Sequence, residues 1–456
     1  MKKLNFSAIN LGCTKNLVDL EYTVWEILKC SDQTEINFFP DPEDEKVEYL
    51  LINTCGFLSS SRDEAESTIQ YYDDLWKKLI IIGCYVPVKN DDFVKNLKNL
   101  HCITPHEDTK EVASMLLWNE KLKKLQRWVG KLKQDKLKKY LDSIHWDRWN
   151  SKAFVWGSEN VRAFFNAPLG HEYLKIAEWC NNTCSFCIIP KIRGKQKSRT
   201  IEDILEEVKI MVQSWIKEIE IISQDTTRYW VDLYKKPFLY ELLEEIDKIE
   251  WDFVYRLFYM YPDVLSLSHL ERLSKLKKML PYFDMPFQHI SPSVLKNMSR
   301  FYDENHIYKL LDYIKELFPK AFFHTNFIVW FPWETDKDFQ MLLDFAKKYE
   351  FDSVSLFGYH DEVLAPSFEL PNKVDFKTIA SRVQAMGEVL NKIYDKKDKL
   401  NQWKQLVWII QEVQEDWKII VREQIKAPEI DDYDTILVKN IIEGTVGTWE
   451  KISYKK

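Results

Sequence analysis

Three cysteines in the middle of the chain have the spacing of metal ligands. The segment EWCNNTCSFCIIPKIRG places Cys180, Cys184 and Cys187 in a CxxxCxxC pattern. Three thiolates can hold three irons of a [4Fe-4S] cluster and leave the fourth iron open to a substrate or cofactor. A structural zinc site needs a fourth protein ligand. Apart from His171, which lies before the preceding predicted strand, no further Cys or His lies within a dozen residues, so we expect an iron–sulfur cluster.

A second set of cysteines follows three predicted strands near the N-terminus. The segments LNFSAINLGC, VEYLLINTC and KLIIIGC predict strands, and the segments between them have helical spacing. This alternation predicts a parallel, doubly wound sheet. Cys13, Cys55 and Cys84 stand at the ends of these strands, and ligands of open α/β sheets bind outside that edge. We expect the three thiols to converge there, and the alternative is three unrelated buried cysteines.

The CxxxCxxC segment follows the first of six predicted strand-then-helix units. The predicted strands are EYLKIAE, KEIEIIS, DFVYRLFY, PYFDMPF, AFFHTNFIVW and FDSVSLF. Repeated units of this kind predict a parallel barrel or part of one, with its active site at the carboxyl ends of the strands. The cysteine cluster falls in the loop after the first strand, where a catalytic group is expected.

Several other side chains are candidates for binding a cofactor or substrate at those strand ends. Polar groups end the second and fourth strands, an arginine lies within the third, and an aromatic ring precedes the last cluster cysteine: Ser223, Gln224, Asp225, His289, Arg256 and Phe186. Structural alternatives stay open, because Phe186 could be a hydrophobic lid and His289 an ordinary buried histidine. A buried arginine such as Arg256 needs an anionic partner, which could be a cofactor carboxylate or a structural ion pair.

The remaining segments complete a three-part organisation of the α/β class. Residues 106 to about 165 are rich in lysine and predict a helical linker. After residue 401 the segments QLVWIIQEV, WKIIVREQI, DTILVK and WEKISY predict a small β-barrel. We therefore divide the chain into an N-terminal doubly wound domain with its linker (1–145), a central partial (β/α)6 barrel (165–395) and a C-terminal β-barrel (401–456).

Composition narrows the functional classes. The 456 residues are 45% hydrophobic and 30% charged, as in an ordinary globular protein. No segment approaches the roughly 20 apolar residues of a membrane span, and MKKLNFSAIN lacks the apolar core of a secretory signal. We expect a cytoplasmic protein without membrane contact. The net charge of −7 argues against one that coats nucleic acid non-specifically.

The motifs resemble a known family over nearly the whole chain. The CxxxCxxC pattern with Phe186 before its last cysteine resembles the radical S-adenosylmethionine superfamily. The segments LGCTKNLVDLE and INTCGFL, with Cys84, resemble the N-terminal domain of the methylthiotransferases, and the C-terminal barrel resembles their TRAM domain. The segments NTCGFL, ISQDTTRYWVDLY and MPFQHISPSVLKNMSR resemble the branch that modifies an aspartate of a small-subunit ribosomal protein (RimO-like).

This resemblance implies an enzyme with two [4Fe-4S] clusters and S-adenosylmethionine. It assigns Cys180, Cys184 and Cys187 to the radical cluster. It assigns a second, sulfur-carrying cluster to the N-terminal cysteines: Cys13, Cys55 and Cys84. The segment FPWET, with Glu334, resembles the family's FPGET and would contact the adenosine. The implied partners are ribosomal protein twelve, free or in the ribosome, and a reductant such as flavodoxin or ferredoxin.

Two other functions remain as alternatives. The second branch of the family modifies an adenosine of tRNA (N6-isopentenyladenosine). From residue 401 onward the chain has 8 Lys and Arg against 10 Asp and Glu, which favours a basic protein over RNA as the substrate. A non-catalytic iron–sulfur protein for electron transfer or scaffolding would explain the cysteines but not the six strand–helix units.

The glycine and tryptophan contents are unusual together. Glycine is 11 of 456 residues, against about 7% in average proteins, and tryptophan is 17. Trp179, Trp230, Trp330 and Trp333 stand where the family's motifs have glycine, and Trp25 and Trp215 stand where a helix end or face would accept it. Trp76, Trp118 and Trp251 could be ordinary core aromatics. We expect the gene to use UGA for glycine, with UGA read as tryptophan in the printed sequence.

Overall fold

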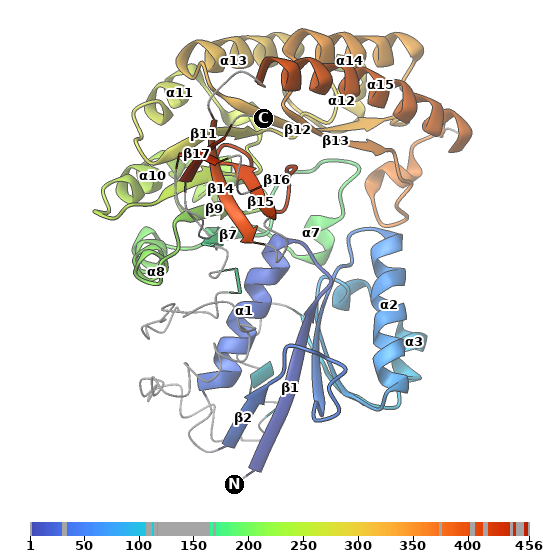
Figure 1. The fold of residues 1–456 in the computed structure, drawn as a ribbon. Helices are drawn as coiled ribbons and strands as arrows, with labels where there is room; N and C mark the ends of the chain where they lie inside the picture. The colour runs from blue at the N-terminus through green and yellow to red at the C-terminus, as the bar shows by residue number, and fades with distance from the viewer. Residues whose placement is uncertain are drawn as a thin grey trace.

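The computed structural model arranges the chain in three parts (Figure 1). It describes residues 2–29, 34–105, 112–113, 116, 165–166, 170–373, 376–401, 406–413, 418–437, 441–443 and 451–454. The predicted helical linker therefore lies almost entirely outside the described residues. Among the described helices, none combines the length and the apolar character that crossing a membrane requires.

The N-terminal part is a five-stranded parallel sheet in the order β2-β1-β3-β4-β5. Its strands are β1 (Lys2–Asn10), β2 (Thr34–Phe38), β3 (Tyr49–Thr54), β4 (Lys78–Gly83) and β5 (Leu100–Ile103), and its helices are α1 (Thr14–Lys29), α2 (Ser59–Asp74) and α3 (Asp91–Lys95). The three predicted strands and two predicted helices are confirmed. The short strands β2 and β5 were not predicted, because five or fewer residues give little periodicity.

The central part is a six-stranded parallel sheet in the order β13-β12-β11-β10-β9-β6. Each predicted strand is present: β6 (His171–Lys175), β9 (Glu218–Ile222), β10 (Val254–Leu257), β11 (Met279–Asp284), β12 (Phe322–Val329) and β13 (Ser353–Gly358). Since β6 and β13 are the two edges and do not pair, the partial barrel is confirmed.

Helices cover the outer face of this sheet, as Figure 1 shows above and to the left. They are α8 (Ile201–Gln213), α10 (Leu239–Asp247), α11 (Leu267–Leu273), α12 (Pro292–Asn297), α13 (Glu304–Leu317), α14 (Asp336–Tyr349) and α15 (Phe376–Asn401). The cysteine segment adds the short elements β7 (Ala177–Glu178), α7 (Ile189–Ile192) and β8 (Lys197–Ser198), and the short helix α9 (Val231–Tyr234) follows β9. Apolar strand residues such as Ile219 and Ile221 pack in the core cluster under these helices.

The inner face of the sheet is covered by the other two parts of the chain. Because strand residues alternate between faces, Ile222 of β9 points away from the helices. It packs in one buried cluster with Val18 of α1 and Ala427 of the C-terminal part. The open barrel is thus completed by segments from both ends of the sequence, and α1 in particular lies directly beneath it (Figure 1).

The C-terminal part is a five-stranded antiparallel sheet in the order β16-β15-β14-β18-β17. It comprises β14 (Leu406–Val413), β15 (Lys418–Glu423), β16 (Asp434–Leu437), β17 (Ile441–Glu443) and β18 (Lys451–Tyr454). The four predicted strands are confirmed and β17 is additional. The described residues contain no pairing of β16 with β17, so the structure shows a small sheet and not a closed barrel.

Candidate functional site

The CxxxCxxC segment forms the loop between β7 and α7, after the first strand of the central sheet. Its cysteines are partly exposed and not in disulfides. Backbone N–H groups of Asn182 and Ile189 point at two of the sulfurs, 3.4 Å from Cys180 Sγ and 3.5 Å from Cys187 Sγ. Burial raises the pKa of the Cys180 and Cys187 thiols to about 12. Ligation of a metal would therefore displace protons from both sulfurs.

This cysteine loop is held from two sides. Asn182 donates its side-chain N–H to Asp225 Oδ2 at 2.7 Å, which ties the loop to the carboxyl end of β9. Ser185 donates from its backbone N to Met298 O at 3.0 Å and from its hydroxyl to Asn297 O at 2.7 Å, which ties the loop to the end of α12. The loop is thereby fixed over the strand ends before any cofactor binds.

The N-terminal cysteines lie at one edge of their sheet, as predicted. Thr54 and Gly83 are partners in the β3–β4 register, so Cys55 and Cys84 leave neighbouring strands at the same level. A Cβ atom at Gly56 would lie 2.4 Å from Cys84 O, which explains why glycine follows Cys55. The thiols of Cys13 and Cys84 both approach Asn16 Oδ1, at 3.6 and 3.5 Å.

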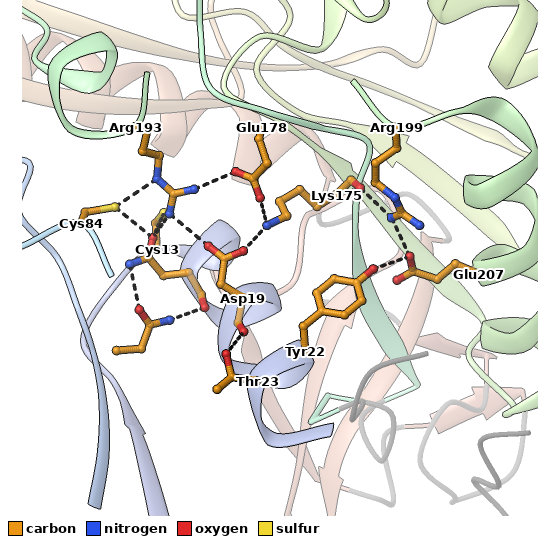
Figure 2. A network of polar contacts seen from close by, with 12 residues as sticks. Cys13, Asp19, Tyr22, Thr23, Cys84, Lys175, Glu178, Arg193, Arg199 and Glu207 are labelled. Carbon is orange, nitrogen blue, oxygen red and sulfur yellow. Dashed lines mark hydrogen bonds and ion pairs between the residues drawn. The ribbon is translucent and has the colours of Figure 1, made fainter. Parts of the chain in front are cut away.

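Arg193 connects this edge to the central domain. It lies at the end of α7, six residues after Cys187, and is 4% exposed. Its Nε donates to Cys84 Sγ at 3.0 Å, and its Nη2 reaches both Asn16 Oδ1 and Asp19 Oδ2. The segment that follows the CxxxCxxC cysteines thus contacts the N-terminal cysteine edge through one buried guanidinium (Figure 2).

A buried ion-pair network surrounds Arg193. Asp19 of α1 pairs with both Arg193 and Lys175, and Glu178 pairs with the same two cations. Two acids and two bases thus compensate each other away from water, and Figure 2 shows them between α1 and the start of the central sheet. A second contact, from Tyr22 Oη to Glu207 Oε2 at 2.9 Å, fixes the same helix further along.

The charges of this network act on the N-terminal thiols in different ways. Burial raises the pKa of Cys84 to about 11, against the effect of Arg193. Burial would also raise the pKa of Cys13, but Lys15, Arg193 and hydrogen bonds outweigh it and lower that pKa. Cys13 is therefore the sulfur of this pair that more readily carries negative charge.

The donor chemistry of both sites fits iron–sulfur clusters. Each site offers three thiols from a loop or sheet edge with backbone or side-chain N–H groups aimed at the sulfurs, which is the environment that tunes such clusters. Among the described residues, no three Cys, His, Asp or Glu side chains are close enough to hold a metal ion as they stand. The thiols of each group lie in one region of the structure, but they are too far apart to ligate one metal ion together.

The polar residues that end β9 have distinct surroundings. Asp225 accepts from Asn182 and Thr227 and pairs with Arg228, so its carboxylate organises the cysteine loop. Ser223 is fully buried and accepts from the backbone N of Asp225. The amide of Gln224 is buried and neither its nitrogen nor its oxygen has a hydrogen-bond partner among the described residues. Gln224 is thus the residue of this group with capacity left for a ligand.

His289 and Glu334 lie together at the ends of β11 and β12. His289 is fully buried, and burial lowers its pKa to about 3, so it is neutral. Its Nδ1 accepts from Ser291 N at 3.0 Å, which places the proton on Nε2, 3.7 Å from Glu334 Oε2. Glu334 accepts from the backbone of Trp330 and Phe331 and pairs with Arg382. Its carboxylate therefore holds its own loop together, and the expected contact of this segment with adenosine stays a prediction.

For two candidates the structure favours the structural alternative. Phe186 packs edge-on against Phe331 with ring centroids 6.4 Å apart, as a hydrophobic lid would. Arg256 is fully buried and pairs with Glu218, and it donates to Ile425 O at 2.8 Å. The structure therefore favours a structural ion pair for Arg256, because β9 supplies its anionic partner, Glu218, and the C-terminal part supplies carbonyl acceptors.

Sequence reasoning missed Asn16, Asn182 and Arg193. Each is a polar residue beside a cysteine segment, where solvated side chains are common, so its residue type did not indicate a role in the site. The signal that could have found Arg193 is an arginine shortly after Cys187 that could pair with Asp19, an acid shortly after Cys13. That pairing becomes apparent only when α1 is placed under the central sheet.

Comparisons with known proteins follow the same division of the chain. Residues 5–104 match the model of the uncharacterized protein family UPF0004, and residues 174–346 match that of the radical SAM superfamily. The chain is 31% identical over 430 residues to the ribosomal protein uS12 methylthiotransferase RimO of Aquifex aeolicus, covering 94% of this chain and 90% of the relative. It is 32% identical over 455 residues to that of Clostridioides difficile, covering 98% and 96%.

A solved structure shares the fold at low sequence identity. The radical S-adenosylmethionine methyltransferase TsrM from Kitasatospora setae, with cobalamin and a [4Fe-4S] cluster bound, superposes with a TM-score of 0.55 and 11% identity. The match covers 80% of this chain and 77% of that one. At this identity the comparison shows the fold alone.

Replacing Arg193 tests the network that joins the two cysteine sets. We expect Arg193→Met to lower the free energy of unfolding by about 3 kcal/mol, because it leaves buried acids without a partner. Chemical denaturation measures the change. Lys95→Met is the matched control, since its ion pair with Asp92 is exposed and should contribute nothing measurable. A variant at position 193 as stable as the control would contradict the role given to the network.

Proposed function

This chain belongs to the family of ribosomal protein uS12 methylthiotransferases (RimO), and on that premise we propose that it adds a CH3S group to the β-carbon of an aspartate of uS12. The reaction replaces an unactivated C–H bond, which protein side chains cannot break unaided. We propose two [4Fe-4S] clusters and S-adenosylmethionine as the cofactors that do so.

One observation carries the proposal beyond family membership. Two groups of three cysteines, far apart in sequence, follow strands of two different sheets, and Arg193, six residues after Cys187, donates to Cys84 of the other group. A protein with a single cluster has no need of the second group. Two open clusters that face one another would bring a sulfur donor and a radical source to the same substrate carbon.

The residues divide the work between the two sites. Cys180, Cys184 and Cys187 would hold the cluster that supplies the electron for cleavage of S-adenosylmethionine and thereby the hydrogen-abstracting radical. The second group would hold the sulfur-carrying cluster: Cys13, Cys55 and Cys84. Asn182 and Asp225 fix the first loop, and Arg193 fixes the distance between the sites.

Two further residues are suited to contact the cofactor or the substrate. The unpartnered amide of Gln224 could both donate and accept at the carboxyl end of β9. The Nε2–H of His289, also without a hydrogen-bond partner in the described chain, could donate to a ligand at the end of β11. Both residues lie at strand ends, where ligands of parallel barrels bind. We propose the cytoplasm as the site of action and a flavodoxin or ferredoxin as the electron donor.

Cluster counting tests the two-site proposal. The anaerobically reconstituted protein should contain about eight irons, as two [4Fe-4S] clusters. Substituting alanine for all of Cys180, Cys184 and Cys187 should halve the iron and abolish S-adenosylmethionine cleavage. The same change at Cys13, Cys55 and Cys84 should also halve the iron but leave some uncoupled cleavage. Cys102→Ala is the control, since that cysteine lies within β5 and pairs with Ile80, four residues before Cys84. Full iron in the second triple variant would refute the N-terminal cluster.

Product analysis tests the substrate. Incubated with S-adenosylmethionine, reductant and either ribosomes or free uS12, the enzyme should add one methylthio group to a single aspartate, which peptide mass spectrometry locates. Transfer RNA is assayed in parallel. Methylthiolation of its isopentenyladenosine with none on uS12 would assign the chain to the other branch. Cluster uptake without modification of either substrate would favour a non-catalytic iron–sulfur protein.

A further inference from the structure

Arg300 is a buried arginine that forms no ion pair with the described residues. It follows α12 and is 6% exposed. Its Nη2 donates to Pro286 O at 3.1 Å, but Nε and Nη1 are buried and have no hydrogen-bond partner among the described residues. Asp225 and Asp263 act on Arg300 electrostatically but do not pair with it. Leaving charged donors unsatisfied away from water is costly, so the two unpartnered donors suit an additional anion.

Aromatic rings hold the guanidinium in place. Its carbon lies 4.3 Å from the ring centre of Tyr261, 5.7 Å from that of Phe186 and 5.9 Å from that of Tyr302. Rings stabilise a cation but cannot accept the N–H groups in the plane of the guanidinium. The edge that carries Nε and Nη1 is thereby kept available for an anion.

Arg300 lies next to the cysteine loop. Ser185, between two cluster cysteines, is hydrogen-bonded to Asn297 and Met298, just before Arg300 in the chain. Arg300 interacts electrostatically with both Cys184 and Cys187. Its donors thus lie beside the place where three thiolates would collect negative charge.

We propose that Arg300 binds the negative charge at the radical cluster, through N–H groups directed either at the cluster or at the carboxylate of S-adenosylmethionine bound to it. The inference rests on the proposed function, since both anions belong to it. Cationic hydrogen bonds to a cluster raise its reduction potential, whereas hydrogen bonds to a carboxylate strengthen cofactor binding.

Measurements on Arg300→Gln and Arg300→Lys distinguish the two anions. If the cluster is the anion, Arg300→Gln should lower the midpoint potential measured without S-adenosylmethionine. If the carboxylate is the anion, the same change should weaken S-adenosylmethionine binding at least tenfold at constant iron content. Arg300→Lys should recover part of either effect.

The control is Arg272→Gln, because Arg272 is paired with Glu241 and Glu244 on the outer helices. An Arg300→Gln protein with normal iron, potential and affinity would overturn the inference while leaving the proposed function intact. If the wild-type chain takes up no cluster, the proposed function itself fails.

A separate observation concerns the tryptophans. Nine of the 17 lie in the described residues, and six of those nine have positive φ, from 61° to 74°: Trp76, Trp179, Trp215, Trp230, Trp330 and Trp333. Thirteen described residues other than glycine have positive φ, and Phe and Tyr together contribute only Tyr259. Bulky side chains rarely adopt this conformation, whereas glycine does so without steric cost.

Two of these six tryptophans, Trp76 and Trp215, end helices in a motif that favours glycine. At the end of α2, Trp76 N donates to Asp73 O and Lys77 N to Tyr72 O, and at the end of α8, Trp215 and Ile216 repeat the pattern. These are the paired bonds of a Schellman motif, whose left-handed position is usually glycine. Both indoles are largely exposed, so packing does not explain their presence.

The sequence-based expectation is thereby refined at two positions. Trp76, which sequence alone left open as a core aromatic, belongs with the glycine positions. Trp25 does not, because it lies inside α1 and is 1% exposed, although its indole nitrogen has no hydrogen-bond partner in the described chain. The other five expected positions all have positive φ: Trp179, Trp215, Trp230, Trp330 and Trp333.

We infer that the native polypeptide carries glycine at these six positions, because its gene contains UGA codons that the host reads as glycine. Three of the positions flank the proposed cofactor site. Trp179 adjoins Cys180, and Trp330 and Trp333 lie in the loop after β12. The indole of Trp330 lies 3.6 Å from the Arg382 guanidinium and donates to Thr378 O. Glycine there would free this space beside Glu334.

The gene sequence and the native protein test this inference directly. UGA at the six codons, and glycine at those positions in peptides of the protein purified from its source, is the expected result. UGG at all six codons, or tryptophan in the native peptides, would overturn it. In the chain as printed, glycine at 179, 330 and 333 together should strengthen S-adenosylmethionine binding.

Stability gives an independent measurement. We expect Trp76→Gly and Trp215→Gly each to raise the melting temperature by about 2–4 °C, because each removes a side chain from a left-handed residue. Trp251→Gly is the matched control, since Trp251 is similarly exposed but is not among the positive-φ residues. Losses at 76 and 215 as large as that of the control would contradict the inference.

Discussion

The contact on which the molecule most depends is the buried guanidinium of Arg193. An arginine removed from water must have anions around it, and here Asp19 and Glu178 supply them from two different domains. Because the network is satisfied only when α1 lies under the central sheet, electrostatics fixes the angle between the domains. The same guanidinium donates to Cys84, so domain packing and the geometry of the proposed second cluster are set by one residue.

Parallel sheets explain how distant cysteines come together. In the N-terminal sheet each strand runs in the same direction, so the residues after β3 and β4 emerge at one edge in register. The strands of the central sheet are also parallel. Its cysteine loop is held by hydrogen bonds to the residues that follow β9 and to the end of α12.

The partial barrel leaves an inner face that must be covered. Its buried Glu218 pairs with both Arg256 and Arg422, the second of which comes from β15, and Ala427 packs in the cluster that covers the same face. The small C-terminal sheet therefore serves as part of the barrel's core as well as a candidate substrate surface. Its acidic balance suits a basic ribosomal protein.

The sequence by itself determined the class of fold, the six strand–helix units, the two cysteine groups and the glycine-like tryptophans. These features are local, since periodicity, spacing and motif position are properties of neighbouring residues. Tertiary structure alone decided that Arg193 bridges the domains, that Arg256 pairs with Glu218 and that Arg300 has no ion-pair partner in the described part of the chain. The partners of a buried charge come from segments hundreds of residues away, and no local pattern records which of them will meet.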